Sequence, residues 1–356
     1  MHIKSLDGLR GVAAYIVVFG HFAGYPLFAD IGQLGVMIFF VLSGYLMGQI
    51  YLTQRPGLDV IGVYFTNRFA RIAPAYLLVV AISYGLFLLT GRVGPFPPIT
   101  TLPELLEHLL FLRGAGVLWT IPVEVQFYVL FPLLWLTAYH LGRPMLVMVS
   151  LGIVWLAASV GFAAPPALAQ AVQYFLAGML VAGLPVEISR KYDIPFVAAV
   201  VVTGLSLPRV REALGLESLG QWESILHLAG ATLLLLATVN SRLAQVLLGN
   251  RVAAFFGAIS FSVYLLHVPV MRVLEVAGIA TQENQLLGFL LVAGATTAVA
   301  FVMWRLVEVP ARQALRQAGR RRFATLALAW AFPALGIAAL VAVPDLQAAS
   351  TAIAAP

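Results

Sequence analysis

The sequence predicts an all-α polytopic membrane protein, and three observations support this fold class. The 356 residues are 61% hydrophobic and 10% charged, whereas a soluble domain carries about 25% charged residues. The hydrophobic residues fall in long runs, and a helix needs roughly 20 apolar residues to cross the hydrocarbon core. No long hydrophilic domain interrupts these runs. We therefore expect most of the chain to lie in a bilayer.

Eleven segments are predicted as membrane helices, about ten of them forming the core and one more following near the C-terminus. They cover residues 9–29, 33–53, 70–90, 117–140, 144–162, 168–185, 194–208, 222–240, 251–277, 285–309 and 323–343. The largest polar connection, residues 91–116, is predicted to contain a small amphipathic helix at 103–112. The predicted domains are a transmembrane domain of residues 1–318 and an additional C-terminal membrane helix with a short tail, residues 319–356.

The basic residues predict the orientation of the chain. With the N-terminus in the cytoplasm, 16 of the 21 lysines and arginines fall on the cytoplasmic side and five on the outer side, as the positive-inside rule requires. This scatter among short loops also accounts for the net charge of +6 without a nucleic-acid partner. The absence of cysteine excludes disulfides, zinc–thiolate sites and cysteine nucleophiles, and we expect no metal.

Three ionisable residues, His21, Glu124 and His267, lie inside the apolar runs. Ionisable groups in a membrane are costly and are therefore candidates for function. With a rise of about 1.5 Å per residue, His21 lies roughly 16 Å beyond Arg10 along a helix. All three residues are expected in the middle or outer half of a core ~30 Å thick, where they can share one cavity.

His21 and Glu124 each have a catalytic and a structural interpretation. A neutral imidazole can accept the proton of an alcohol near neutral pH, which makes His21 a candidate general base; the alternative is a buried histidine bonded to a neighbouring carbonyl. Glu124 follows Pro122, which denies the helix a backbone donor and can expose polar groups to a cavity. Its carboxylate can orient a histidine or accept a substrate hydroxyl, or it can bond to Tyr128 one turn later.

His267 lies three residues after Tyr264, so that both face the same side of a helix. Pro269 follows and interrupts the hydrogen bonds of that helix. We expect His267 and Tyr264 to bind the acceptor or to stabilise the oxyanion; the alternative for His267 is to fill the gap that the proline leaves.

Arg68 and Arg71 form an R-x-x-R pair that places two guanidinium groups on one helix face. Paired guanidinium groups suit phosphate, because each can bind oxygen atoms bidentately. The alternative is an anchor at the cytoplasmic end of a membrane segment, and Arg10 has the same two interpretations. Ser43 lies among glycines in FFVLSGYLMG, which favours close helix packing or the close approach of an extended ligand.

These motifs resemble, in their order, those of the acyltransferase-3 family of integral membrane O-acyltransferases. The matching segments cover roughly residues 4–312 and read LDGLRGVAA before His21, then FFVLSGYL, RFARIAP, LWTIPVEVQFYVLFPLL, ISFSVYLLHVP and VEVPAR. Each motif is weak by itself, and their combination is specific. Two departures are Val125, where many members have a second acid, and Val309, where members often have lysine.

The resemblance implies transfer of an acyl group, usually acetyl, from cytoplasmic acyl-CoA to a hydroxyl of a glycan or lipid-linked saccharide at a bacterial inner membrane. It implies catalysis by His21 and donor binding by Arg10, Arg68 and Arg71. Glu124 matches the acid of a W-[ST]-x-x-x-E motif, and Tyr264 and His267 match Y-L-x-H. Some members carry a fused periplasmic esterase-like domain, which we do not expect here.

Two other classes of protein remain open from the residues alone. A transporter or flippase for a lipid-linked glycan would explain many membrane spans and buried histidines acting as proton relays. A non-catalytic membrane scaffold would need His21 only for stability. Direct attack of the acceptor and a relay through an acylated His21 are equally compatible with the sequence.

Overall fold

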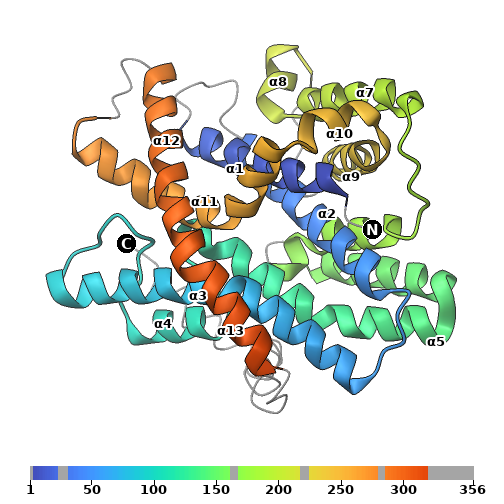
Figure 1. The fold of residues 1–356 in the computed structure, drawn as a ribbon, viewed down its shortest axis with the longest axis horizontal. Coiled ribbons are helices and arrows are strands. Elements are labelled where there is room, and N and C mark those ends of the chain that lie inside the picture. Colours follow the sequence, from blue (N-terminus) through green and yellow to red (C-terminus); the bar gives the residue numbers. More distant parts are fainter. Residues whose placement is uncertain (1–2, 23–30, 161–166, 217–223, 280–284, 320–356) are drawn as a thin grey trace. The chain divides into compact units, whose positions relative to one another are not determined.

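The computed structural model describes residues 3–22, 31–160, 167–216, 224–279 and 285–319 (Figure 1). Within these residues the regular structure is helical, apart from one isolated bridge between Ser189 and Ser241, which confirms the predicted all-α class. The α-helices are α1 Lys4–Phe22, α2 Ile31–Tyr51, α3 Leu58–Thr90, α4 Leu102–Leu109, α5 Thr120–Val160, α6 Val172–Val181, α7 Asp193–Leu205, α8 Pro208–Ala213, α9 Ile225–Asn240, α10 Arg242–Leu248, α11 Arg251–Val276, α12 Gln285–Met303 and α13 Val309–Gly319.

Several described helices are suited to a membrane. Five helical segments are long and apolar enough to cross one: Ile31–Tyr51, Leu58–Thr90, Gly116–Ser159, Arg251–Val276 and Leu286–Gln317. The predicted spans at 168–185, 194–208 and 222–240 correspond to the shorter helices α6, α7 and α9, of 10, 13 and 16 residues. The span predicted at 323–343 lies outside the described residues. The chain is thus an integral membrane protein, whereas eleven spans and a cytoplasmic N-terminus stay predictions.

Two helices begin earlier than predicted. Helix α1 begins at Lys4 rather than residue 9, so that Lys4 and Asp7 also lie within the helix that carries His21. Helix α3 begins at Leu58 rather than residue 70, and no proline lies between them. Its 33 residues extend about 50 Å, which exceeds a core of ~30 Å. Arg68 and Arg71 therefore lie about a third of the way along α3, and their place at the cytoplasmic end of the membrane-crossing part stays a prediction.

One predicted boundary appears as a break inside a single long helix. Within α5, Gly142 has φ 79° and ψ 176°, a backbone conformation that favours glycine. Pro144 follows two residues later and lacks the N–H that would continue the hydrogen bonds of the helix. The break lies between the predicted spans 117–140 and 144–162, which confirms that the backbone changes direction there.

The chain divides into two compact units: unit 1 is Met1–Thr53 with Gln173–Val307, and unit 2 is Gln54–Val172 with Glu308–Pro356. In unit 1, α1 packs against α2 and α11, and α11 packs against α12 (Figure 1). The core of this packing is a cluster of buried residues from α1, α11 and α12: Ala14, Val18, Phe22, Ile259, Val263, Val292 and Ala300.

A glycine lets α1 and α11 approach closely. A Cβ atom built on Gly257 of α11 would lie 2.0 Å from the carbonyl oxygen of Asp7 in α1, far inside any real contact distance. Small residues at helix crossings allow backbones to approach in this way in membranes. The crossing sets the register of the two helices that carry His21 and His267.

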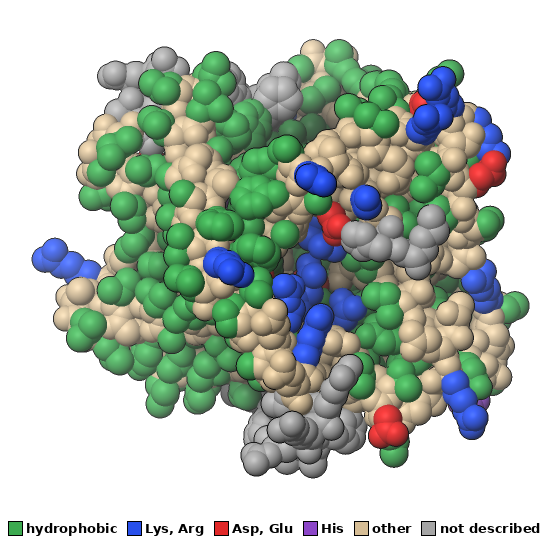
Figure 2. Space-filling view, viewed as in Figure 1, with side chains coloured by type: hydrophobic (Ala, Val, Ile, Leu, Met, Phe, Trp, Pro, Cys, Tyr) green, Lys and Arg blue, Asp and Glu red, His purple; other side chains and the backbone are tan. Residues whose placement is uncertain are grey.

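The outer surface of unit 1 is apolar along α11 and α12. Figure 2 shows mainly hydrophobic side chains over these helices, and the exposed ones include Val252, Val273, Leu286, Leu287, Leu290 and Val302. A helix surface of this kind is suited to contact with lipid chains rather than water.

Unit 2 is held together by aromatic side chains between α3 and α5. Tyr64 of α3 stacks on Phe131 of α5 with ring centroids 5.5 Å apart, and its hydroxyl donates to the Tyr128 carbonyl at 2.8 Å. Trp135, one turn beyond Phe131, donates from Nε1 to the Gln54 carbonyl at 2.9 Å. All four aromatic side chains are fully buried, so they form the packed contact between α3 and α5.

The short helix α4 confirms the amphipathic helix predicted at 103–112. Thr101 caps its N-terminus and Glu104 reaches back to the Thr101 backbone N–H, which makes a capping box. Burial of Glu104 would raise the pKa of its carboxyl, but hydrogen bonds from Thr100 and Thr101 outweigh burial and lower it.

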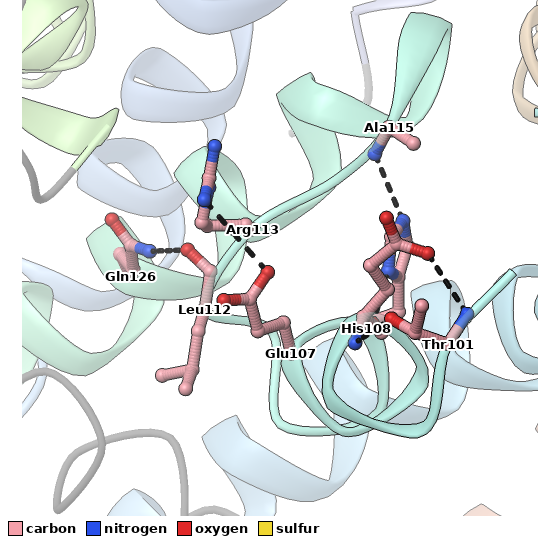
Figure 3. A network of polar contacts seen from close by, with 8 residues as sticks. Thr101, Glu107, His108, Leu112, Arg113, Ala115 and Gln126 are labelled. Atoms are coloured by element: carbon pink, nitrogen blue, oxygen red, sulfur yellow. Dashed lines mark hydrogen bonds and ion pairs between the residues drawn. The ribbon is translucent and has the colours of Figure 1, made fainter. Parts of the chain in front are cut away.

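His108 ties α4 to the chain that follows it (Figure 3). Its Nδ1 lies 2.7 Å from the Glu104 carbonyl oxygen, and its Nε2 accepts from the Ala115 backbone N–H at 2.8 Å. The residue is 3% exposed, and burial lowers the pKa of its imidazole below the ordinary 6.5. The neutral ring therefore fits the two bonds, because Nε2 can accept only without a proton.

Candidate active site

Helix α1 carries two of the predicted site residues, one near each end. Arg10 lies in the first half of the helix, where its guanidinium nitrogen is 3.7 Å from the Asp7 carboxylate. His21 lies at the other end, at the last turn. The spacing predicted from the sequence, roughly 16 Å along one helix, is confirmed in the sense that no break separates them. Asp7 was not predicted, although opposite charges three residues apart on a helix are a usable signal.

The structure brings His21 together with His267, 246 residues later in the chain. Nε2 of His267 lies 3.3 Å from Nδ1 of His21, and the two ring centroids are 4.8 Å apart. Nδ1 of His21 also lies 2.9 Å from the carbonyl oxygen of Val17 one turn earlier. His21 is exposed, whereas His267 is 1% exposed. The structure thus places two of the three ionisable residues of the apolar runs in contact, and one cavity shared by all three stays a prediction.

Tyr264 completes this group on α11. Its backbone carbonyl lies 2.7 Å from Nδ1 of His267, and its ring lies 5.8 Å from the His267 ring, centroid to centroid. The Tyr264 side chain packs edge-on against Phe39 of α2. His267 thus contacts side chains of α1 and α11, and its Nδ1 bonds to a carbonyl of its own helix.

In unit 2, Tyr128 links two other predicted site residues. Its hydroxyl donates to Oε1 of Glu124 one turn earlier on α5, and the Arg68 guanidinium carbon lies 5.6 Å from its ring centroid. This cation–π contact favours a positive charge over the face of the buried ring. The structure thus shows the Glu124–Tyr128 bond that the sequence offered as an alternative, and it adds Arg68 to the same group.

Pro122, two residues before Glu124, lies at the start of α5 rather than inside it. Pro122 lies in the first turn of α5, which begins at Thr120, where backbone N–H groups have no partner inside the helix in any case. The prediction that Pro122 frees polar groups within the helix is therefore wrong.

Ser43 lies in the middle of α2. It is 8% exposed, and the neighbouring Gly44 packs against α6, where an added Cβ would lie 2.0 Å from the Phe175 carbonyl oxygen. The small residues of this segment therefore serve helix packing, and donor binding by Ser43 stays a prediction. Among the described residues, no group of three or more His, Asp or Glu side chains is placed to hold a metal ion.

Comparison with known proteins assigns the family. Residues 3–305 match the model of the acyltransferase-3 family, described as an acyltransferase domain. The peptidoglycan O-acetyltransferase OatA of Listeria monocytogenes is 30% identical over 149 residues, 37% of this chain and 24% of its own length. The putative membrane-bound transacylase BcsY of Komagataeibacter xylinus is 40% identical over 79 residues, 22% of this chain and 19% of its own.

These similarities cover only part of each relative. The O-acetyltransferase OatA of Staphylococcus aureus is 25% identical over 163 residues, and the aligned part is 26% of that protein. This chain thus spans about a quarter of the length of these O-acetyltransferases, and no solved structure matches it significantly. The family match, in contrast, extends over most of the chain. The chain belongs to the acyltransferase-3 family.

Proposed function

We propose that this chain is a multi-pass O-acyltransferase of the bacterial cytoplasmic membrane, with its N-terminus in the cytoplasm. It moves an acetyl group from acetyl-CoA to a hydroxyl of a glycan or lipid-linked saccharide. The observation that carries the proposal is His21: an exposed imidazole near the end of an apolar helix, bonded to a second, buried histidine, in a chain that belongs to an acyltransferase family. The name of the Listeria relative, a peptidoglycan O-acetyltransferase, supports a glycan acceptor.

In the proposed reaction, His21 acts as the general base. Nε2 takes the proton of the acceptor hydroxyl while its oxygen attacks the carbonyl carbon of the thioester. The C–S bond then breaks, the acyl group stays on the acceptor oxygen, and the proton passes to the departing CoA thiolate. General-base catalysis of this kind contributes roughly 10²–10⁴-fold to a rate.

The remaining residues take binding roles. Arg10, Arg68 and Arg71 bind the phosphates of acyl-CoA, since guanidinium groups suit phosphate, and Ser43 contributes to binding the donor. The ion pair with Asp7 holds the Arg10 side chain, and the Tyr128 ring holds Arg68. Glu124 and Tyr264 bind the acceptor hydroxyl, and His267 supports His21.

Donor binding is tested by thermal unfolding of the purified protein in detergent, with and without acetyl-CoA. A ligand that binds the folded state raises the apparent Tm by mass action. We expect a rise for the wild type that is lost in Arg68→Ala/Arg71→Ala. The matched control is Arg190→Ala/Lys191→Ala, which removes the same charge from exposed positions and should keep the rise.

Two further outcomes separate the proposal from its alternatives. No rise in the wild type at millimolar acetyl-CoA would contradict an acyl-CoA donor and favour a transporter. A covalent acyl group on His21, trapped in a reaction with donor alone, would replace direct attack by a relay through an acyl-histidine.

A further inference from the structure

The hydrogen bonds of His267 determine which of its nitrogens carries a proton. Nδ1 lies 2.7 Å from the Tyr264 carbonyl oxygen, and a carbonyl oxygen can only accept. Nδ1 of His267 therefore carries a hydrogen. In the neutral ring, Nε2 then holds a lone pair and acts as an acceptor.

The same reasoning applies to His21. Its Nδ1 lies 2.9 Å from the Val17 carbonyl oxygen, so this nitrogen also carries a hydrogen. Nε2 of His267 lies 3.3 Å from the same Nδ1 of His21. It can accept the hydrogen of that Nδ1 only if it carries no hydrogen itself. A hydrogen on Nε2 of His267 would place two N–H groups against each other. The observed contacts therefore fit one proton arrangement: a neutral His267 accepting from the Nδ1–H of His21.

We propose that His267 is a positioning residue, which holds His21 in the Nδ1–H tautomer and thereby leaves Nε2 of His21 unprotonated as the proton acceptor. The role of His267 in catalysis rests on the proposed function, whereas the tautomer of His21 does not depend on it. It differs from the substrate or oxyanion contact predicted for His267 from the sequence, since both of its ring nitrogens are engaged within the protein.

His267 adds something that the Val17 carbonyl alone does not. In an α-helix the backbone N–H of residue 21 bonds to the carbonyl oxygen of residue 17. The Val17 oxygen is therefore shared between this backbone bond and the His21 side chain. Nε2 of His267 supplies a second acceptor from α11. When Nε2 of His21 takes the acceptor proton, the positive ring keeps both acceptors at Nδ1. The buried carboxylate of a Ser-His-Asp triad holds its histidine in one tautomer in a comparable way.

The packing around His267 suits a fixed acceptor. The residue is 1% exposed, in a helix whose neighbouring residues Val263 and Leu265 are fully buried. The Tyr264 carbonyl fixes the ring by its bond to Nδ1. A buried ring held in this way presents Nε2 in one direction, whereas the exposed His21 depends on its partners for orientation.

The tautomer is tested by nitrogen-15 NMR of the ¹⁵N-histidine-labelled protein in lipid, without substrates. Free histidine favours the Nε2–H tautomer, so the expected result is distinct: His21 should show a protonated Nδ1 and an unprotonated Nε2. The chain has six histidines, and the His21→Gln variant identifies the His21 signals by their loss. An Nε2–H tautomer at His21 in the wild type would overturn the inference.

Two substitutions test the part played by His267. His267→Phe keeps a ring but removes the acceptor, and we expect His21 to lose its single tautomer. We expect kcat to fall roughly 10- to 100-fold, less than the loss of the general base itself. The KM for acetyl-CoA should stay unchanged. His267→Gln offers an amide oxygen near the place of Nε2 and should restore the tautomer and most of kcat. His140→Gln, an exposed site on α5, is the control and should change neither.

The outcomes separate the inference from the proposed function. A His267→Phe variant with the wild-type tautomer and kcat would overturn the inference. If that variant does not fold, the wild-type spectrum and the His267→Gln variant still decide. If the spectrum shows the expected tautomers but the wild type transfers no acetyl group, the proposed function fails and the tautomer assignment stands.

Discussion

The two units build their polar groups in different ways. In unit 1, His21 and His267 are 246 residues apart in the chain and meet because α1 and α11 pack closely. In unit 2, Tyr128 bonds to Glu124 one turn away on the same helix. The histidine pair is partly exposed, whereas the Tyr128 ring is fully buried. A group made by helix packing should therefore be sensitive to the crossing of two helices, and a group made within one helix should not.

The largest effect on this comparison is expected from Gly257→Ala. The new Cβ would meet the Asp7 backbone carbonyl, at 2.0 Å before relaxation, and backbone cannot move aside as a side-chain tip can. We expect a loss of about 3 kcal/mol of stability, the upper part of the overpacking range, and a lower kcat as His21 and His267 separate. Thermal unfolding and a transfer assay on the folded fraction measure the two effects.

The control for this prediction is Gly294→Ala in α12, where an added Cβ has no neighbour within 4 Å. Its stability and kcat should stay near the wild type. Equal behaviour of the two alanine variants would show that the α1–α11 crossing does not control the histidine pair.

A smaller effect is expected from Tyr128→Phe in unit 2. The change removes the hydroxyl that donates to Glu124, and losing a buried partner of a carboxyl group costs about 1–2 kcal/mol. Transfer should fall as well, because Glu124 loses its orientation. Tyr64→Phe removes the bond to the Tyr128 carbonyl and should lower stability by about 1 kcal/mol while transfer persists. Equal losses of transfer in both variants would argue against a role for Glu124.

The smallest effect is a pH dependence at His108, outside the long spans. Burial lowers the pKa of its imidazole below 6.5 in the folded chain, so the unfolded chain binds the proton more readily. The stabilisation is complete above pH 6.5 and is lost as the pH falls below that value. We expect the Tm of the wild type to fall more between pH 7 and pH 5.5 than that of His108→Gln, which keeps an acceptor for the Ala115 N–H but does not titrate. An equal fall in Tm for the wild type and His108→Gln would contradict a contribution of His108 to the pH dependence of stability.

Local features of the molecule were predictable from the sequence because they follow helical spacing. The 20-residue apolar runs predicted α2 and α11 closely, Thr101 and Glu104 fit the capping box of α4, and the Glu124–Tyr128 contact follows from its spacing of four residues. Helix starts were harder to predict. The polar residues Lys4 and Asp7 lie within α1 rather than before it.

Contacts between distant segments were predictable only as possibilities. Similar depths allowed His21 and His267 to share a cavity, but their pairing depends on the close approach at Gly257, which no local pattern reveals. The acceptor role of the Val17 carbonyl has no sequence signal at all, because a backbone atom contributes it. The tautomers of His21 and His267 are inferred from these hydrogen bonds, so they could not be predicted from the sequence.

The most direct test of the account is transfer of a labelled acetyl group from acetyl-CoA to membrane glycans by wild-type protein and by His21→Ala at equal amounts of folded protein. The account predicts label in the glycan fraction with the wild type, removed by mild base as an ester is, and a loss of roughly 10²- to 10⁴-fold with His21→Ala. Full transfer by a correctly folded His21→Ala protein would contradict the account.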